Sequence, residues 1–183
     1  SAIALDTGAV TVSAELDADG DLDVVLGGTR GGKSGLFVAR NASRPVTGPL
    51  ELVELSHAQC SLTTALPAAP VGLTAADLDD DNSVDIVAFV PGHSPIAFLN
   101  QRQDRFQRRE FAGPPATGPG CALDADGDGS LELAYPAGSA IAIVDSSGQV
   151  HRQQLATGDV AARVTAADLD MDDIARGKFD FDA

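Results

Sequence analysis

Large aromatic side chains are scarce in this sequence, whose 183 residues include no Trp, one Tyr and 7 Phe. Ala, Gly, Val, Thr and Ser dominate instead, and this composition favours closely packed strands and tight turns over long helices. No apolar run approaches the roughly 20 residues that a membrane-spanning helix needs. The sequence therefore predicts a chain without a transmembrane segment.

Cysteines and basic residues are also few. Cys60 and Cys121 are too few for a disulfide framework, and whether they form a single bridge is left open by the sequence. The chain has 12 Lys and Arg against 27 Asp and Glu, which gives a formal net charge of −15. We therefore expect no nucleic-acid partner. The one concentration of positive charge is either a solvated hairpin edge or a docking patch for an acidic partner, and it comprises Arg102, Arg105, Arg108 and Arg109.

Catalytic motifs are missing from the sequence. The three histidines, His57, His93 and His151, share no motif and lie far apart. The patterns G-x-S-x-G, H-E-x-x-H and C-x-x-C do not occur. The sequence therefore predicts a protein that is not an enzyme.

One stretch, GGTRGGKS at residues 27–34, matches the phosphate-binding P-loop pattern G-x-x-x-x-G-K-[ST]. A P-loop Lys and Ser must open a helix whose N-terminus faces the phosphates. The residues that follow, 35–40, are an apolar run that favours a strand, and Pro45 comes soon after. We therefore interpret residues 27–34 as a glycine-rich hairpin turn and expect no nucleotide binding.

Acidic residues, by contrast, are concentrated rather than spread. Of 22 Asp, 18 fall in the four clusters 17–23, 77–85, 124–128 and 168–182. Carboxylates so close together repel one another unless a cation lies between them. The clustering therefore points to metal binding.

The clusters share one register of nine positions, which defines loop 1 (15–23), loop 2 (77–85) and loop 3 (124–132). Acids recur at positions 1, 3, 5 and 9, Gly or Asn holds position 6, and an aliphatic residue holds position 8. Loop 4 (168–180) begins alike but fits only with four extra residues. The candidate metal ligands are Glu15, Asp17, Asp19, Asp21 and Asp23 in loop 1; Asp77, Asp79, Asp81, Ser83 and Asp85 in loop 2; Asp124, Asp126, Asp128, Ser130 and Glu132 in loop 3; and Asp168, Asp170, Asp172 and Asp180 in loop 4.

This spacing suits calcium. Acids at alternate positions of a tight turn aim their carboxylates at one point, and Gly or Asn at position 6 permits the left-handed backbone that the turn needs. Many hard oxygen ligands favour Ca²⁺ over Mg²⁺, which demands a smaller octahedral cage. An EF-hand would need an acid at position 12 and flanking helices, whereas position 12 here is Leu26, Ala88 or Tyr135. We predict three Ca²⁺ sites and leave the fourth open.

The loops begin 62, 47 and 44 residues apart, and intervals of this size are typical of propellers and other repeat arrays. Each interval can hold four short strands. In the second interval we expect strands at 71–77, 85–90, 95–101 and 105–112, and in the third at 120–123, 131–135, 140–145 and 150–155. The predicted fold is all-β, with four-stranded antiparallel sheets that form the blades of a β-propeller.

The pattern resembles the FG-GAP/VCBS repeats of integrin-α-like β-propellers. The resemblance lies in the D-x-D-x-D-[GN]-x-[hydrophobic]-[DE] loops, in the Gly or Pro-Gly after the next strand, and in Phe98-Leu99-Asn100 followed by Asp104-Arg105-Phe106. It implies that each loop joins the first two strands of a blade and binds Ca²⁺. The expected blades of this single, partial domain (1–183) are 9–66, 70–113, 118–157 and an incomplete 161–183.

The sequence narrows the function to a few alternatives. We expect a calcium-stabilised protein-binding or structural module that is extracellular or periplasmic, where free Ca²⁺ is abundant. A non-catalytic part of a secreted polysaccharide-active enzyme and a lectin or adhesin are the alternatives. Closed propellers have roughly four to eight blades, so we expect the open ends to be covered by a protein partner, a second copy or further blades.

Overall fold

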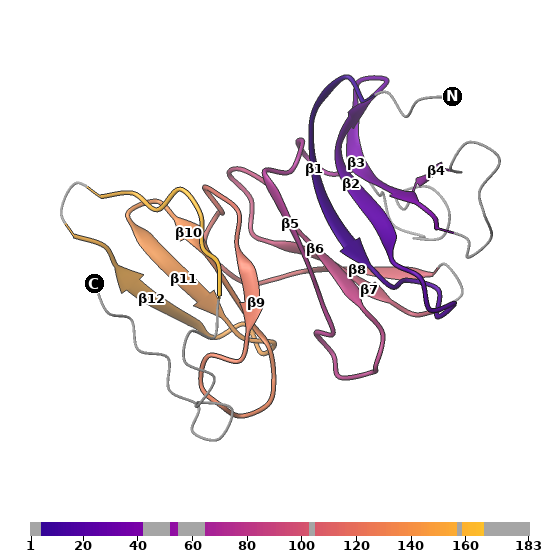
Figure 1. The fold of residues 1–183 in the computed structure, drawn as a ribbon. Helices are drawn as coiled ribbons and strands as arrows, with labels where there is room; N and C mark the ends of the chain where they lie inside the picture. The colour runs from indigo at the N-terminus through magenta and orange to yellow at the C-terminus, as the bar shows by residue number, and fades with distance from the viewer. Residues whose placement is uncertain (1–4, 42–51, 55–64, 103–104, 157–158, 167–183) are drawn as a thin grey trace.

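A computed structural model describes residues 5–41, 52–54, 65–102, 105–156 and 159–166. All regular structure in these residues is β, in three four-stranded antiparallel sheets. Figure 1 shows the three sheets side by side in chain order, from the indigo first sheet to the orange third. The expected all-β fold of four-stranded sheets is therefore confirmed. The described residues contain no helix long and apolar enough to cross a membrane.

In each sheet the strands follow one another in sequence order, so each is a meander. The first sheet consists of β1 (Thr7–Ala14), β2 (Asp23–Arg30), β3 (Lys33–Ala39) and β4 (Leu52–Glu54). The second consists of β5 (Gly72–Ala76), β6 (Asp85–Phe89), β7 (Ile96–Asn100) and β8 (Phe106–Glu110). The third consists of β9 (Cys121–Leu123), β10 (Glu132–Ala137), β11 (Ala140–Val144) and β12 (Val150–Gln154).

The strands expected in the second and third intervals are all present, with one notable difference in length. We expected the third sheet's second strand to end at Tyr135, before a turn at Pro136, but β10 continues to Ala137. Pro136 pairs with Ile141 and accepts a hydrogen bond from Thr117 N at 2.9 Å, so its carbonyl is used although it has no N–H to donate. The turn itself is confined to Gly138 and Ser139.

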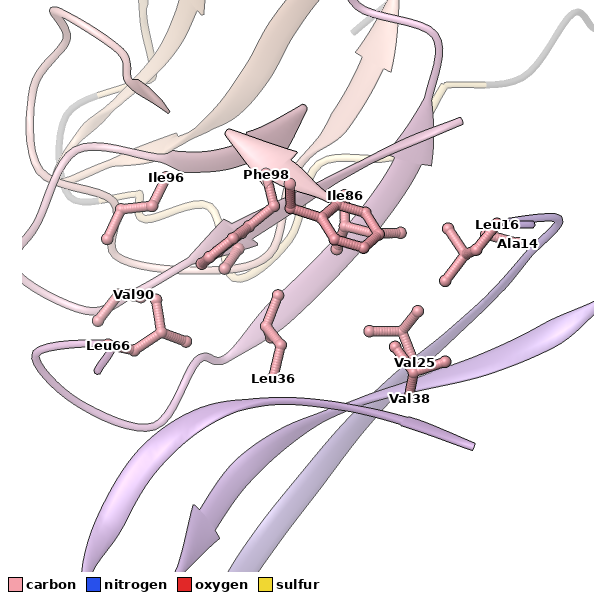
Figure 2. Packing of buried hydrophobic residues seen from close by; sticks show 12 residues of the cluster. Ala14, Leu16, Val25, Leu36, Val38, Leu66, Ile86, Val90, Ile96 and Phe98 are labelled. Atoms are coloured by element: carbon pink, nitrogen blue, oxygen red, sulfur yellow. The ribbon is translucent and has the colours of Figure 1, made fainter. Parts of the chain in front are cut away.

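Two apolar cores lie between the sheets and use alternate residues of the same strands. Toward the first sheet, β6 and β7 direct Ile86, Ile96 and Phe98 against Val25, Leu36 and Val38 (Figure 2). Toward the third sheet, Val87, Phe89 and Leu99 pack against Leu133, Tyr135 and Val144. Both faces of the second sheet are therefore covered, which explains why every residue of β6 and β7 is buried.

The first strands of the sheets are neighbours: β1 contacts β5, and β5 contacts β9. Glycines allow the close approach. A Cβ on Gly72 would lie 2.5 Å from Pro119 Cβ, and one on Gly27 would lie 2.5 Å from Pro70 Cγ. These distances are far below van der Waals contact, so a larger residue at either position would require the neighbouring proline or the strand itself to shift.

The P-loop-like stretch is a β-hairpin. We expected residues 27–34 to form the turn, but β2 extends to Arg30 and β3 begins at Lys33, so only Gly31 and Gly32 turn. Both have positive φ, +57° and +72°, as a type I′ hairpin turn requires. Lys33 and Ser34 therefore open a strand rather than the helix that a P-loop needs. Gly27 lies within β2, paired with Leu36, and its missing side chain makes room for Pro70.

Candidate metal centre

The three loops occupy equivalent places in the three sheets. Loop 1 joins β1 to β2, loop 2 joins β5 to β6, and loop 3 joins β9 to β10. The position 9 acids, Asp23, Asp85 and Glu132, are the first residues of β2, β6 and β10. The register read from the sequence thus corresponds to one repeated position in the fold.

The three loops also share an unusual backbone. Position 6 is left-handed in each, as predicted: φ is +92° at Gly20, +62° at Asn82 and +91° at Gly129. Position 4 is left-handed as well, with φ of +63° at Ala18, +57° at Asp80 and +77° at Gly127. Sequence reasoning missed position 4, although Gly and Asp are residues that tolerate this conformation. Two left-handed residues per loop close the turn tightly.

Position 5 acids hold the second half of each loop. Their Oδ1 atoms accept a hydrogen bond from the position 7 amide, at 3.0 Å for Asp19, 2.8 Å for Asp81 and 2.7 Å for Asp128. This is an Asx-turn, in which a side chain takes the place of a backbone acceptor. The donors are the backbone amides of Asp21, Ser83 and Ser130.

In loops 2 and 3 the carboxylate of the position 1 acid accepts hydrogen bonds from two backbone amides of its own loop. Asp77 accepts from the amides of Asp81 at 3.1 Å and Asn82 at 2.8 Å. Asp124 accepts from the amides of Gly127 at 2.7 Å and Gly129 at 3.0 Å. The carboxylates are thereby held at the centre of their loops.

The acids at position 9 are buried, with 0% of Asp23, 0% of Asp85 and 5% of Glu132 exposed. Asp85 accepts hydrogen bonds from Asn100 N at 2.7 Å and Leu78 N at 2.9 Å, and Glu132 accepts one from Ala125 N at 2.6 Å.

Burial raises the pKa of Asp85 to about 6, although its two amide bonds act in the opposite direction. Burial also raises the pKa of Glu132, of Asp23 and, together with the charges of Asp81 and Asp77, of Asp79. A buried carboxylate is costly unless its charge is paired. The raised pKa values therefore mark groups that a cation would stabilise.

The carboxylates that come together can be stated for each loop. In loop 2 an oxygen from each of Asp77, Asp79 and Asp85 lies within 4.8 Å of the others, and in loop 3 the same holds for Asp124, Asp126 and Glu132. Two oxygens that bind one Ca²⁺ at about 2.3–2.6 Å can be up to about 5 Å apart. Positions 1, 3 and 9 of loops 2 and 3 therefore fit a metal ion, and their position 5 acids serve the turn.

Loop 1 is different. Its close group consists of Glu15, Asp17 and Asp19, without the buried Asp23. Arg40, which follows β3, donates from Nη1 to Asp17 Oδ2 and lies 3.5 Å from Asp23 Oδ2. Sequence reasoning did not assign Arg40 to the site. The strand register identifies Arg40 as part of the site: because Val24 pairs with Ala39, Arg40 lies opposite Asp23.

The predicted arginine cluster is divided among several contacts. Arg102 donates from Nε to Ser83 Oγ at 3.0 Å and from Nη2 to Asp81 O at 2.8 Å, on the rim of loop 2. Arg109 donates to Ser146 O and lies over the Phe111 ring, 5.2 Å from its centroid. These arginines therefore support the second and third sheets.

Some predictions fall on residues outside the described part of the chain. These are the loop 4 candidates Asp168, Asp170, Asp172 and Asp180, together with Cys60 and hence the pairing of the two cysteines. Comparison with known proteins adds no assignment: no protein-family model matches the sequence, and no curated protein matches it.

Proposed function

We propose that this chain is part of a calcium-stabilised β-propeller that acts outside the cytoplasm as a protein-binding or structural module. The observation that carries the proposal is the recurrence of one acidic loop, in one register, between the first two strands of three successive sheets. A single acidic turn would carry little weight. Threefold repetition of its hydrogen bonds and left-handed residues indicates a selected site.

The packing of the sheets supports the propeller. Each sheet is a four-stranded meander, its faces pack on those of the next sheet, and the first strands β1, β5 and β9 are neighbours. Propeller blades are four-stranded sheets repeated radially around a central channel. The FG-GAP/VCBS-like loop pattern lies where that resemblance implies, between the first and second strands.

The donor set supports calcium as the ion. Carboxylate oxygens are hard ligands, and loops 2 and 3 each bring three of them together. Ca²⁺ accepts six to eight oxygens in flexible geometry, so backbone carbonyls and water can complete its shell. Outside the cytoplasm free Ca²⁺ is abundant enough to fill sites of modest affinity, which is why we place the protein there.

The proposed role is contact rather than catalysis. The sequence contains no catalytic motif, and the acidic loops connect the first two strands of each sheet. Bound ions also reduce the net charge of −15, which would otherwise oppose close approach of an acidic partner.

Calorimetric titration of metal-stripped protein tests the proposal. We expect Ca²⁺ to bind, and to bind more tightly than Mg²⁺. Asp79→Asn in loop 2 should remove one ion, whereas Asp6→Asn, a change of the same charge at an exposed residue beside the β2–β3 hairpin turn, should remove none. Preference for Mg²⁺, or no binding at all, would overturn the proposal.

A further inference from the structure

The residue opposite the position 9 acid is different in each of the three sheets, and in the first sheet it is Arg40. It lies opposite Asp23, the position 9 acid, because Val24 pairs with Ala39. In the second sheet, pairing of Ile86 with Phe98 places Leu99 opposite Asp85. In the third, pairing of Leu133 with Val144 places Asp145 opposite Glu132. Of the three described sheets, the first alone has a cationic side chain at this position.

The guanidinium joins the carboxylates of positions 3 and 9. Nη1 donates to Asp17 Oδ2 and lies 3.5 Å from Asp23 Oδ2, and the Arg40 side chain is only 18% exposed. In loops 2 and 3 the acids of positions 3 and 9 are the ones that meet the position 1 acid. In loop 1, Arg40 therefore contacts the acids at the two positions, 3 and 9, that in loops 2 and 3 belong to the candidate metal groups. Hydrogen bonds between two charged groups are stronger than those between neutral groups.

Glu15, the position 1 acid of loop 1, also makes different hydrogen bonds from the position 1 acids of loops 2 and 3. Its Oε1 atom accepts from the amides of Asp17 at 3.2 Å and Ala18 at 2.8 Å, near the start of the loop. Asp77 and Asp124 instead accept from amides at positions 4 to 6. The remaining close group of loop 1 lacks a buried acid, and its Asp17 already binds the arginine.

Loop 2 provides the contrast. Arg102 also contacts that loop, but its donors reach the Ser83 hydroxyl and the Asp81 carbonyl. The three carboxylates of loop 2 still lie within 4.8 Å of one another. An arginine beside a loop is thus compatible with a candidate metal group, whereas an arginine bonded to its position 3 and 9 carboxylates places a fixed positive charge where the ion would sit.

We propose that Arg40 takes the place of the metal ion in loop 1, so that this loop is held by its own arginine and binds no Ca²⁺ while loops 2 and 3 do. The inference rests on the proposed calcium function of those two loops. It makes the first sheet independent of calcium and the joints of the second and third sheets dependent on it.

Three isosteric variants separate the loops, and each removes one member of a close group: Asp19→Asn in loop 1, Asp79→Asn in loop 2 and Asp126→Asn in loop 3. Native mass spectrometry in Ca²⁺ counts the ions on each variant. We expect one ion fewer with Asp79→Asn and with Asp126→Asn, and the wild-type number with Asp19→Asn. Because each variant is compared with the wild-type protein, any ion in loop 4 adds equally to every count and does not affect the result. One ion fewer with Asp19→Asn would overturn this inference, whereas no loss with the other two would overturn the calcium proposal itself.

Arg40→Met tests the role of the arginine directly, with Arg30→Met as a control of the same charge change at the exposed end of the β2–β3 hairpin. We expect Arg40→Met to gain one ion and Arg30→Met to gain none, and the gained ion should be lost again in Arg40→Met/Asp17→Asn, which also removes the position 3 carboxylate that the arginine contacts. A folded Arg40→Met protein without the extra ion would overturn the inference.

Hydrogen exchange of the wild-type protein provides a measurement that needs no variant. Adding EGTA should accelerate exchange in loops 2 and 3 and leave loop 1 unchanged. Acceleration in loop 1 equal to that in the other loops would also contradict the inference.

Discussion

Asn100 Nδ2 donates a hydrogen bond to the carbonyl oxygen of Leu16 at 3.0 Å, although 84 residues separate them. Asn100 is at the end of β7 in the second sheet, and Leu16 is at position 2 of loop 1 in the first; both are 3% exposed. The same Asn100 amide group is 3.3 Å from Val84 O, and its backbone N–H donates to Asp85. One buried side chain therefore connects two neighbouring acidic loops.

Asn100→Ala should destabilise the protein by about 1–3 kcal/mol, because it leaves the buried Leu16 carbonyl without this donor. Denaturant unfolding in saturating Ca²⁺ measures the change. Asn41 is the matched control. Its backbone N–H donates to Asp23 as the backbone N–H of Asn100 donates to Asp85, but the Asn41 residue is exposed. Asn41→Ala should change stability by less than about 0.5 kcal/mol. Equal effects of the two substitutions would show that the connection between loops adds no stability.

The left-handed Ala18 offers a second test. A non-glycine residue at φ of +63° costs roughly 1–2 kcal/mol, because its Cβ approaches the backbone too closely. Glycine removes that strain but loses about 0.4–1 kcal/mol through the greater freedom of the unfolded chain. Ala18→Gly should therefore stabilise the protein by up to about 1.6 kcal/mol. Ala125→Gly, at position 2 of loop 3, should destabilise it. Thermal melts of the two variants should shift in opposite directions, and a fall in melting temperature for Ala18→Gly would contradict the assigned backbone.

These residues show which structural features could be predicted from the sequence and which could not. Local features were predictable: the repeated acids marked the loops, and Gly20, Asn82 and Gly129 marked their left-handed position 6. Ala18 carries no such mark, because nothing in an alanine signals positive φ. The roles of Arg40 and Asn100 were missed for another reason. Their partners lie in other strands or in another sheet, so their roles follow from strand register and sheet packing rather than from neighbouring residues.

Tyr135 gives a pH-dependent prediction. Burial raises the pKa of its phenol to about 12, while the Arg152 charge acts in the opposite direction. Its hydroxyl donates to Pro114 O at 3.0 Å. An unfolded tyrosine titrates near pH 10, at about its reference value. Between these two values the unfolded chain holds fewer protons than the folded one, so this contribution to stability is complete below about pH 10 and is lost as the pH rises through about 12.

The measurement for Tyr135 is direct, since the chain has one Tyr and no Trp. Phenolate absorbance in the near ultraviolet therefore reports Tyr135 alone. The folded protein should ionise at higher pH than the same protein in denaturant. Coinciding titration curves, recorded while circular dichroism still shows the folded state, would contradict the burial of this ring.

Removal of calcium should destabilise the protein. Without an ion, the buried Asp85 and Glu132 and the acids around them carry charge that no cation in their loops offsets. A ligand that binds only the folded state adds about 2.7 kcal/mol per site when its concentration is 100 times its dissociation constant. In a domain of this size each kcal/mol shifts the melting temperature by about 2–4 °C. Melts in EGTA and in millimolar Ca²⁺ should thus differ by roughly 5–10 °C for each occupied site. Asp126→Asn should lose part of that difference and Asp19→Asn should keep it. Overlapping melts of the wild-type protein in EGTA and in Ca²⁺ would show that its acidic loops are stable without metal.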